Sequence, residues 1–129
     1  MDKRRSINVP GASHANPIPS ASRRGPFVVT GAIAGTDPAT GKVPEDLDQQ
    51  CRQMFDNVRR VLTAAGGTPD DIVKMTVWIT DRALRPVLNK HWVEMFPDPD
   101  SRPARHTVAS GDFTPPMQIQ CDLLAVIED

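Results

Sequence analysis

The sequence of 129 residues contains no tyrosine and only six other aromatic residues, four Phe and two Trp. It has two cysteines, Cys51 and Cys121, far apart in the chain and without a closely spaced cysteine or histidine partner. This usage indicates neither a disulfide framework nor a zinc motif, and it is typical of a reduced, cytoplasmic protein. The three histidines are equally dispersed, so the sequence predicts no metal site.

Long apolar runs and an excess of one charge are also absent. The longest apolar run, residues 123–127, is far shorter than the roughly 18 residues of a membrane-spanning helix. Fifteen Lys and Arg against sixteen Asp and Glu leave a net charge of -1. We therefore expect neither a nucleic acid nor a membrane as partner. The basic residues 3–5 resemble the start of a signal peptide, but no apolar segment follows them, which argues against export.

Proline, in contrast, is abundant, with 13 residues, and the hydrophobic fraction of 39% supports a packed core. A chain of this length has enough apolar surface for one core, so residues 1–129 are predicted to form a single domain. Three of the prolines lie in the first twenty residues among small polar residues. Residues 1–16 are therefore expected to form an arm that is flexible or becomes ordered only by docking.

Apolar residues at steps of three and four predict two helices. The first lies between residues 44 and 65, with Pro44, Glu45 and Asp46 suited to its first turn and a Gly-Gly pair after its end. Its apolar face consists of Leu47, Cys51, Met54, Phe55, Val58, Val61, Leu62 and Ala65. The second spans residues 84–96 and ends before two prolines.

Runs rich in β-branched residues, or with apolar residues at every second position, predict strands over residues 27–33, 73–80, 105–110 and 117–127. The resulting order is β, α, β, α, β, β, without an internal repeat. This order predicts the α+β class, with a mixed sheet and both helices on one of its faces.

Polar side chains gather on the last two predicted strands. Gln118, Gln120 and Asp122 share one face of the final strand, opposite an apolar face, while Arg105 and Thr107 share a face of the strand before it. If these strands pair antiparallel, Arg105 lies close to Gln120 or Asp122. An arginine can bind a carboxylate there while an oxygen positions a water molecule.

Periodicity alone favours a purely structural interpretation of these groups. Arg105 and Asp122 could form an ordinary cross-strand ion pair, worth less than ~1 kcal/mol. Cys51, Cys121 and His91 lie on apolar stripes and are interpreted as packing residues.

Several segments together resemble the RidA (YjgF) family of reactive-imine deaminases. The resemblance runs from about Pro17 to Val126, and its most specific part is a helix–Gly–Gly–strand block combined with a Pro-Ala-Arg motif. The segments that carry it are residues 36–41, 57–67, 71–81, 87–89 and 102–108. The resemblance implies a chorismate-mutase-like α+β fold, a homotrimer with ligand sites between subunits, and hydrolysis of enamines or imines such as 2-aminoacrylate to keto acids and ammonia. It implies no metal or organic cofactor.

The resemblance also suggests roles for individual residues. Arg105 matches the arginine that binds the substrate carboxylate, and Thr107 the position whose backbone contacts the ligand. Asn89 matches an asparagine near the cleft, and Gly31 falls in the family's Ser-Gly element, which here reads Thr-Gly.

Two departures point to an altered pocket. Gln120 stands where the family has a water-orienting glutamate; its amide oxygen can orient water but cannot accept a proton, a contribution typically worth ~10²–10⁴-fold. Asp122, about 7 Å further along the same face, is the nearest acid on that strand. Ile18 lies in the segment where the deaminases carry a tyrosine. We therefore expect a different substrate preference, such as a larger enamine of the 2-aminomuconate type.

Three functions remain open on the sequence. The favoured one is an enamine or imine deaminase built on Arg105, with Gln120 or Asp122 acting on water. The second is a non-catalytic module that binds a small ligand or acts like a chaperone in the same cleft. The third is a ribonuclease, against which the balanced charge and the lack of a basic aromatic groove argue.

Overall fold

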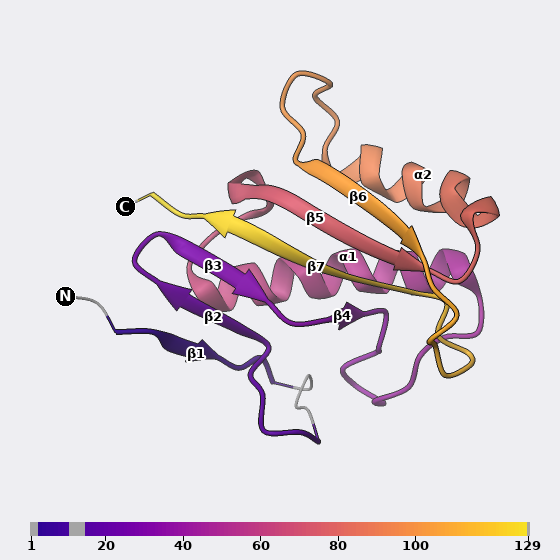
Figure 1. Ribbon diagram of the computed structural model, residues 1–129, viewed down its shortest axis with the longest axis horizontal. Helices are drawn as coiled ribbons and strands as arrows, with labels where there is room; N and C mark the ends of the chain where they lie inside the picture. Colours follow the sequence, from indigo (N-terminus) through magenta and orange to yellow (C-terminus); the bar gives the residue numbers. More distant parts are fainter. Residues whose placement is uncertain (1–2, 11–14, 129) are drawn as a thin grey trace.

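The computed structural model describes residues 3–10 and 15–128. Its sheet runs in the order β1-β2-β3-β7-β5-β6, with β4 also paired to β7 (Figure 1). The strands are β1 (Arg5–Ile7), β2 (Ala21–Arg24), β3 (Phe27–Thr30), β4 (Ile33–Ala34), β5 (Ile72–Ile79), β6 (Ala104–Ala109) and β7 (Ile119–Val126).

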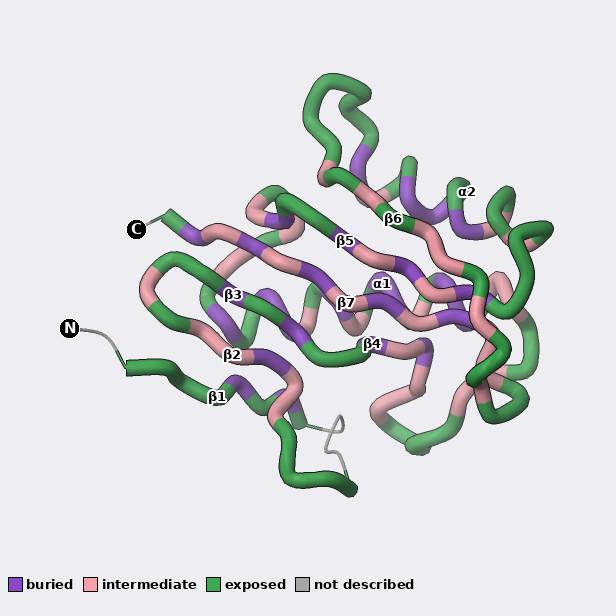
Figure 2. Tube along the Cα trace, viewed as in Figure 1, coloured by how far each residue is buried: buried purple, intermediate pink, exposed green. Residues whose placement is uncertain are grey.

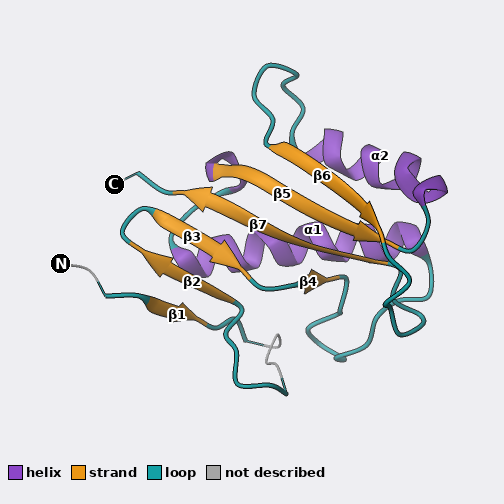
Figure 3. Ribbon diagram, in the orientation of Figure 1, coloured by secondary structure: helices purple, strands orange, loops and turns teal. Residues whose placement is uncertain are grey.

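Two helices, α1 (Leu47–Ala65) and α2 (Arg85–Met95), lie against one face of this sheet (Figures 1 and 3). This arrangement confirms the predicted α+β class. Short 3-10 helices, η1 (Pro69–Asp71) and η2 (Arg82–Leu84), lead into β5 and α2. We call the opposite face, turned away from α1 and α2, the open face. Within the described part of the chain, no helix has the length and apolar character needed to cross a membrane.

The core lies between the helices and the sheet. Every second residue of β7 from Ile119 to Ala125 is buried, as Figure 2 shows, and the residues between them are half-buried. The apolar stripe of α1 is buried as predicted, except that Leu47 is only partly buried. The helix begins later than predicted because Asp46 is its N-cap, with a carboxylate that accepts a hydrogen bond from the Gln49 amide at 3.0 Å. It ends at Gly66, whose φ of 92° favours glycine.

The amino-terminal segment is docked where the structure describes it. β1 pairs antiparallel with β2, and Ile7 and Val9 are buried in the core. The sequence pattern predicted neither strand. The strand predicted over residues 27–33 is interrupted at Gly31, which separates β3 from β4.

The pairing expected between the last two strands is wrong. β6 pairs in parallel with β5, and β7 pairs antiparallel with the other edge of β5. The reason is the connection through α2: a strand, a crossover helix and the next strand form a parallel unit. The segment after β6 then carries the chain past β5 to its far edge.

A buried glutamine ties that segment to α1. The Gln50 side chain is fully buried, and its Nε2 donates to the carbonyl oxygens of Pro44 and Pro116, both at 2.7 Å. Its Oε1 accepts a hydrogen bond from the Gln118 amide at 2.9 Å. The three bonds satisfy the buried amide of Gln50 and tie α1 to the start of β7.

The close approach of Gly35 to α1 gives a stability prediction. A Cβ atom on Gly35 would overlap the carbonyl oxygen of Gln50 and lie 2.8 Å from its Cα, and helix backbone cannot move aside cheaply. Gly35→Ala should therefore lower the free energy of unfolding in urea by about 1–3 kcal/mol. Gly111→Ala is the matched control, since a Cβ there meets nothing within 4 Å. Equal stability of the two variants would contradict this packing.

Candidate functional site

Arg105 lies on β6, on the side of the sheet that carries the helices. It is in register with Met75, which is fully buried under them. Its Nη2 donates to Asn89 Oδ1 at 2.8 Å, and its guanidinium lies 4.9 Å from the centre of the Trp92 ring. Burial lowers the pKa of Arg105, and the positive charge of nearby Arg85 lowers it further. The guanidinium remains charged and is held by two contacts in a fixed orientation.

Helix α2 supplies both of these contacts. Asn89 and Trp92 are three residues apart and so share a face of the helix. Trp92 is buried and packs edge-on against Phe96, with ring centroids 4.7 Å apart. The aromatic platform under Arg105 is therefore part of the core.

Thr107 follows Arg105 on the same face of β6, in register with Val77. β6 ends the path of strands in the described sheet, so the outer edge of its backbone has no neighbouring strand. Backbone groups on that edge are available to a ligand, as the role predicted for Thr107 requires.

Gln120 and Asp122 lie on the open face. Gln120 is in register with Trp78, and Asp122 with Thr76. The Trp78 Nε1 donates to Asp122 Oδ2 at 3.0 Å, so a residue in register with Gln120 also contacts Asp122. Asp122 Oδ1 accepts no hydrogen bond from a described residue.

The expected proximity of Arg105 to Gln120 or Asp122 is therefore wrong within one chain. Arg105 shares the face of Met75, whereas Gln120 shares the opposite face with Trp78, and β5 lies between the two strands. The alternative cross-strand ion pair between Arg105 and Asp122 is excluded for the same reason.

Gly31 and Ile18 belong to the region beside β7. Gly31 lies between β3 and β4, both of which pair with β7, and its amide donates to the Ser20 carbonyl at 3.0 Å. Ile18 precedes that contact by two residues and is 51% exposed. The structure thus divides the predicted residues into two groups. Arg105, Asn89 and Thr107 lie along α2 and β6, and the others, Gln120, Asp122, Gly31 and Ile18, lie along β7 and the strands and loop beside it.

Sequence reasoning missed the two tryptophans that orient these groups. Trp78 alternates with the apolar residues of its strand, at the positions that otherwise hold lysine and threonine. Because an indole N–H needs an acceptor, this position could have indicated a polar partner on that face of the sheet. Trp92 gave no signal, since its place on an apolar helical stripe is typical of a core residue.

The remaining candidates have structural roles. His91 is buried between the helices, with Nε2 2.8 Å from Asp48 Oδ1, as expected of a packing residue. Both cysteines are buried, and burial raises the pKa of the Cys51 thiol to about 12. No group of three or more His, Cys, Asp or Glu residues in the described ranges could hold a metal ion.

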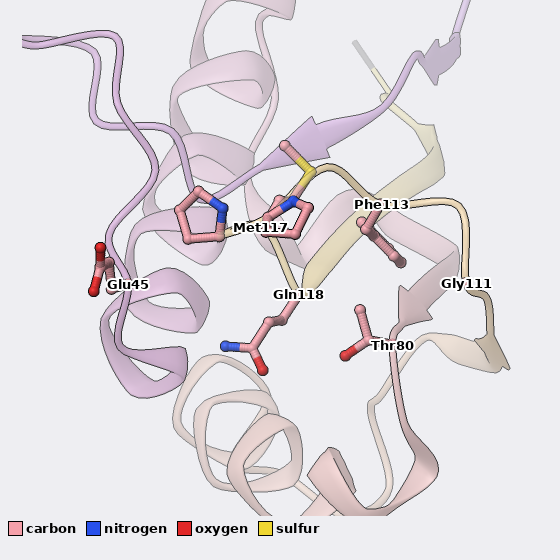
Figure 4. Close-up of a pocket in the computed structure, with 8 residues that line it drawn as sticks. Glu45, Thr80, Gly111, Phe113, Met117 and Gln118 are labelled. Carbon is pink, nitrogen blue, oxygen red and sulfur yellow. The ribbon is translucent and has the colours of Figure 1, made fainter.

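One open pocket of about 350 Å³ lies at the end of the sheet where β7 begins (Figure 4). Gln118 and Thr80 contribute polar groups, and Phe113 and Met117 apolar ones. None of the residues assigned above to the candidate site lines it.

Comparison with known proteins identifies the family. Residues 13–127 match the family described as endoribonuclease L-PSP. A RutC family protein from Aquifex aeolicus is 32% identical over 123 residues, which covers 95% of this chain and 98% of the relative. The 2-iminobutanoate/2-iminopropanoate deaminase of Salmonella typhimurium is 33% identical over 103 residues, which covers 79% of this chain and 80% of the relative.

Solved structures agree with the sequence matches. RidA from the Antarctic bacterium Psychrobacter sp. superimposes with a TM-score of 0.88 at 27% identity, over 95% of this chain and 99% of that one. Escherichia coli TdcF with bound serine superimposes with a TM-score of 0.88 at 27% identity, over 96% of this chain and 99% of that one. The resemblance seen in the sequence is confirmed: the chain belongs to the endoribonuclease L-PSP family, which is the RidA (YjgF) family.

Proposed function

We propose that this chain is a hydrolase that converts 2-imino acids or their enamine tautomers to keto acids and ammonia, in a site completed by a second copy of the chain. The observation that carries the proposal is the Arg105 guanidinium, held by Asn89 and Trp92 and without an acidic partner among the described residues. The names of the deaminase relatives support this reaction, and the serine bound to Escherichia coli TdcF supports a small ligand with a carboxylate.

Arg105 binds the substrate carboxylate. A planar guanidinium that is fixed by an amide and an aromatic ring can offer two parallel N–H groups to a carboxylate without further ordering. The bound carboxylate places the neighbouring imine carbon at a defined distance from the protein, which supplies most of what this reaction needs.

The groups that act on water come from the open face of a neighbouring subunit, because the sheet separates them from Arg105 within one chain. That face carries exposed apolar side chains, including Phe27 at 56% and Val29 at 51% exposure. Apolar surface of this kind favours burial against another copy. A homotrimer with three such sites is the assembly that the family resemblance implies.

Catalysis then proceeds by addition and elimination. A water molecule oriented by the Gln120 amide oxygen attacks the carbon of the protonated imine while Asp122 accepts a proton from it. The C–O bond forms as the C=N double bond becomes single. Asp122 then returns its proton to the amine of the carbinolamine, ammonia leaves as the C–N bond breaks, and the hydroxyl gives its proton to the Asp122 carboxylate as the keto acid carbonyl forms.

The substrate differs from the smallest imines because the pocket lacks an aromatic hydroxyl. Ile18 replaces it with an exposed aliphatic side chain. A larger enamine, such as a compound of the 2-aminomuconate type, fits this change.

The first prediction concerns Arg105. Arg105→Ala should lower kcat/KM for ammonia release from 2-iminobutanoate by about 100-fold or more, because a charge-assisted pair with the carboxylate is lost, and Arg105→Lys should lie in between. Arg59→Ala, on the exposed side of α1, is the control. Wild-type protein that accelerates release over buffer from none of several imines and enamines, including larger ones, would exclude the deaminase and favour a binding module.

The second prediction concerns the groups on the open face. Asp122→Asn should lower the rate of ammonia release by ~10²–10⁴-fold, since the amide keeps the hydrogen bond from Trp78 but cannot accept a proton. Gln120→Glu should raise the rate. Full activity in Asp122→Asn would remove Asp122 from the mechanism, and activity present only in Gln120→Glu would show that the natural chain binds without turnover.

A further inference from the structure

A second arginine, Arg85, lies on the same face of α2 as the residues that contact Arg105 of β6. Arg85 is the first residue of α2, and Asn89, which holds Arg105, is one turn later on the same face of the helix. Trp92, under the Arg105 guanidinium, continues this stripe. Arg85 is close enough for its positive charge to lower the pKa of Arg105.

No ion pair with a described residue accounts for a cation at this position. A helix begins with a positive partial charge, so an arginine in the first turn is unfavourable there, and α2 has no acidic residue in its first turn. Among the described residues, the ion pairs of Asp48 and Glu94 involve Arg52, Lys90 and His91, and neither Arg85 nor Arg105 takes part in one. Two neighbouring guanidinium groups thus lack a carboxylate.

Both side chains keep donors that make no hydrogen bond to a described residue. Arg85 Nε donates to the Arg82 carbonyl at 3.2 Å, which leaves both of its terminal nitrogens available. Arg105 uses Nη2 for Asn89 and keeps its other donors. Arg85 and Asn89 are one turn apart, about 6 Å along the helix. Arg85 therefore reaches towards a ligand bound at Arg105 from a position one turn nearer the start of α2. Two cations offset along a helix in this way match a ligand with two carboxylates better than a single tetrahedral anion.

We propose that Arg85 binds a second carboxylate of the substrate and that the site prefers dicarboxylic 2-imino acids or enamines to monocarboxylic ones. This inference rests on the proposed function, in which Arg105 binds the first carboxylate. Arg85 is then a specificity-determining residue, and the like charge beside Arg105 is compensated when the substrate binds.

Binding of stable product analogues tests this without turnover. We would measure the Kd of 2-oxoglutarate and of 2-oxohexanoate, which has a similar chain length but one carboxylate, by calorimetry on the full-length protein. Wild-type protein should prefer 2-oxoglutarate by about 10-fold or more, the typical effect of one added charged hydrogen-bonding pair. Inorganic phosphate at the same ionic strength should compete weakly.

Arg85→Gln should bring the ratio of the two Kd values close to one, whereas Arg59→Gln should retain the wild-type ratio. Glutamine and arginine have similar helix propensities, and circular dichroism would verify that α2 is intact. A wild-type ratio near one, a ratio that survives Arg85→Gln, or phosphate that displaces 2-oxoglutarate as strongly as a dicarboxylate does, would overturn the inference.

Two further measurements separate this inference from the proposed function. Arg105→Gln should raise the Kd of both analogues, because both bind Arg105 through the carboxylate that they have in common. If ammonia release from imino acids is absent while the preference for 2-oxoglutarate depends on Arg85, the deaminase proposal fails and the dicarboxylate site stands.

Discussion

β5 pairs with β6 along one edge and with β7 along the other, and the two registers fix which side chains can meet. Met75 lies opposite Arg105, and Trp78 opposite Gln120. Met75 is fully buried under the helices, so a slip of one residue in either ladder would turn core side chains to the open face. The packing of the core therefore also places the arginine on one side of the sheet and the water-orienting groups on the other.

Each half of the proposed site is prepared by the fold before substrate arrives. Asn89 and Trp92 orient Arg105 from a helix that buries Leu88 and Trp92 in the core, and the Trp78 indole orients Asp122. Fixed donors cost little further ordering when a ligand binds. In the proposed function the two halves come from different chains, so the exposed apolar residues on the open face would matter for the chemistry as well as for assembly.

The sequence predicted much of this fold, since periodicity reports which residues of an element share a face. It located α1, α2, β5 and β7 and the buried positions of β7. It missed β1 and β2, which are short and largely polar, and it gave β6 the wrong neighbour, because alternation does not reveal which strands pair. The pairing of β6 with β5 depended on the crossover connection through α2. The family resemblance singled out Arg105 and Asn89, whereas Arg85 gave no signal, since an exposed arginine at a helix start has no pattern.

Mixed assemblies test the central claim, that Arg105 of one chain works with Asp122 of another. Arg105→Ala and Asp122→Asn chains would be unfolded together, refolded as a 1:1 mixture, and assayed for ammonia release from 2-iminobutanoate. If each site takes Arg105 from one chain and Asp122 from its neighbour, half of the sites have an intact Arg105. Half of those sites also have an intact Asp122, so about a quarter of the wild-type rate should return. A mixture no more active than the separate variants, while refolded wild-type protein is active, would contradict the account.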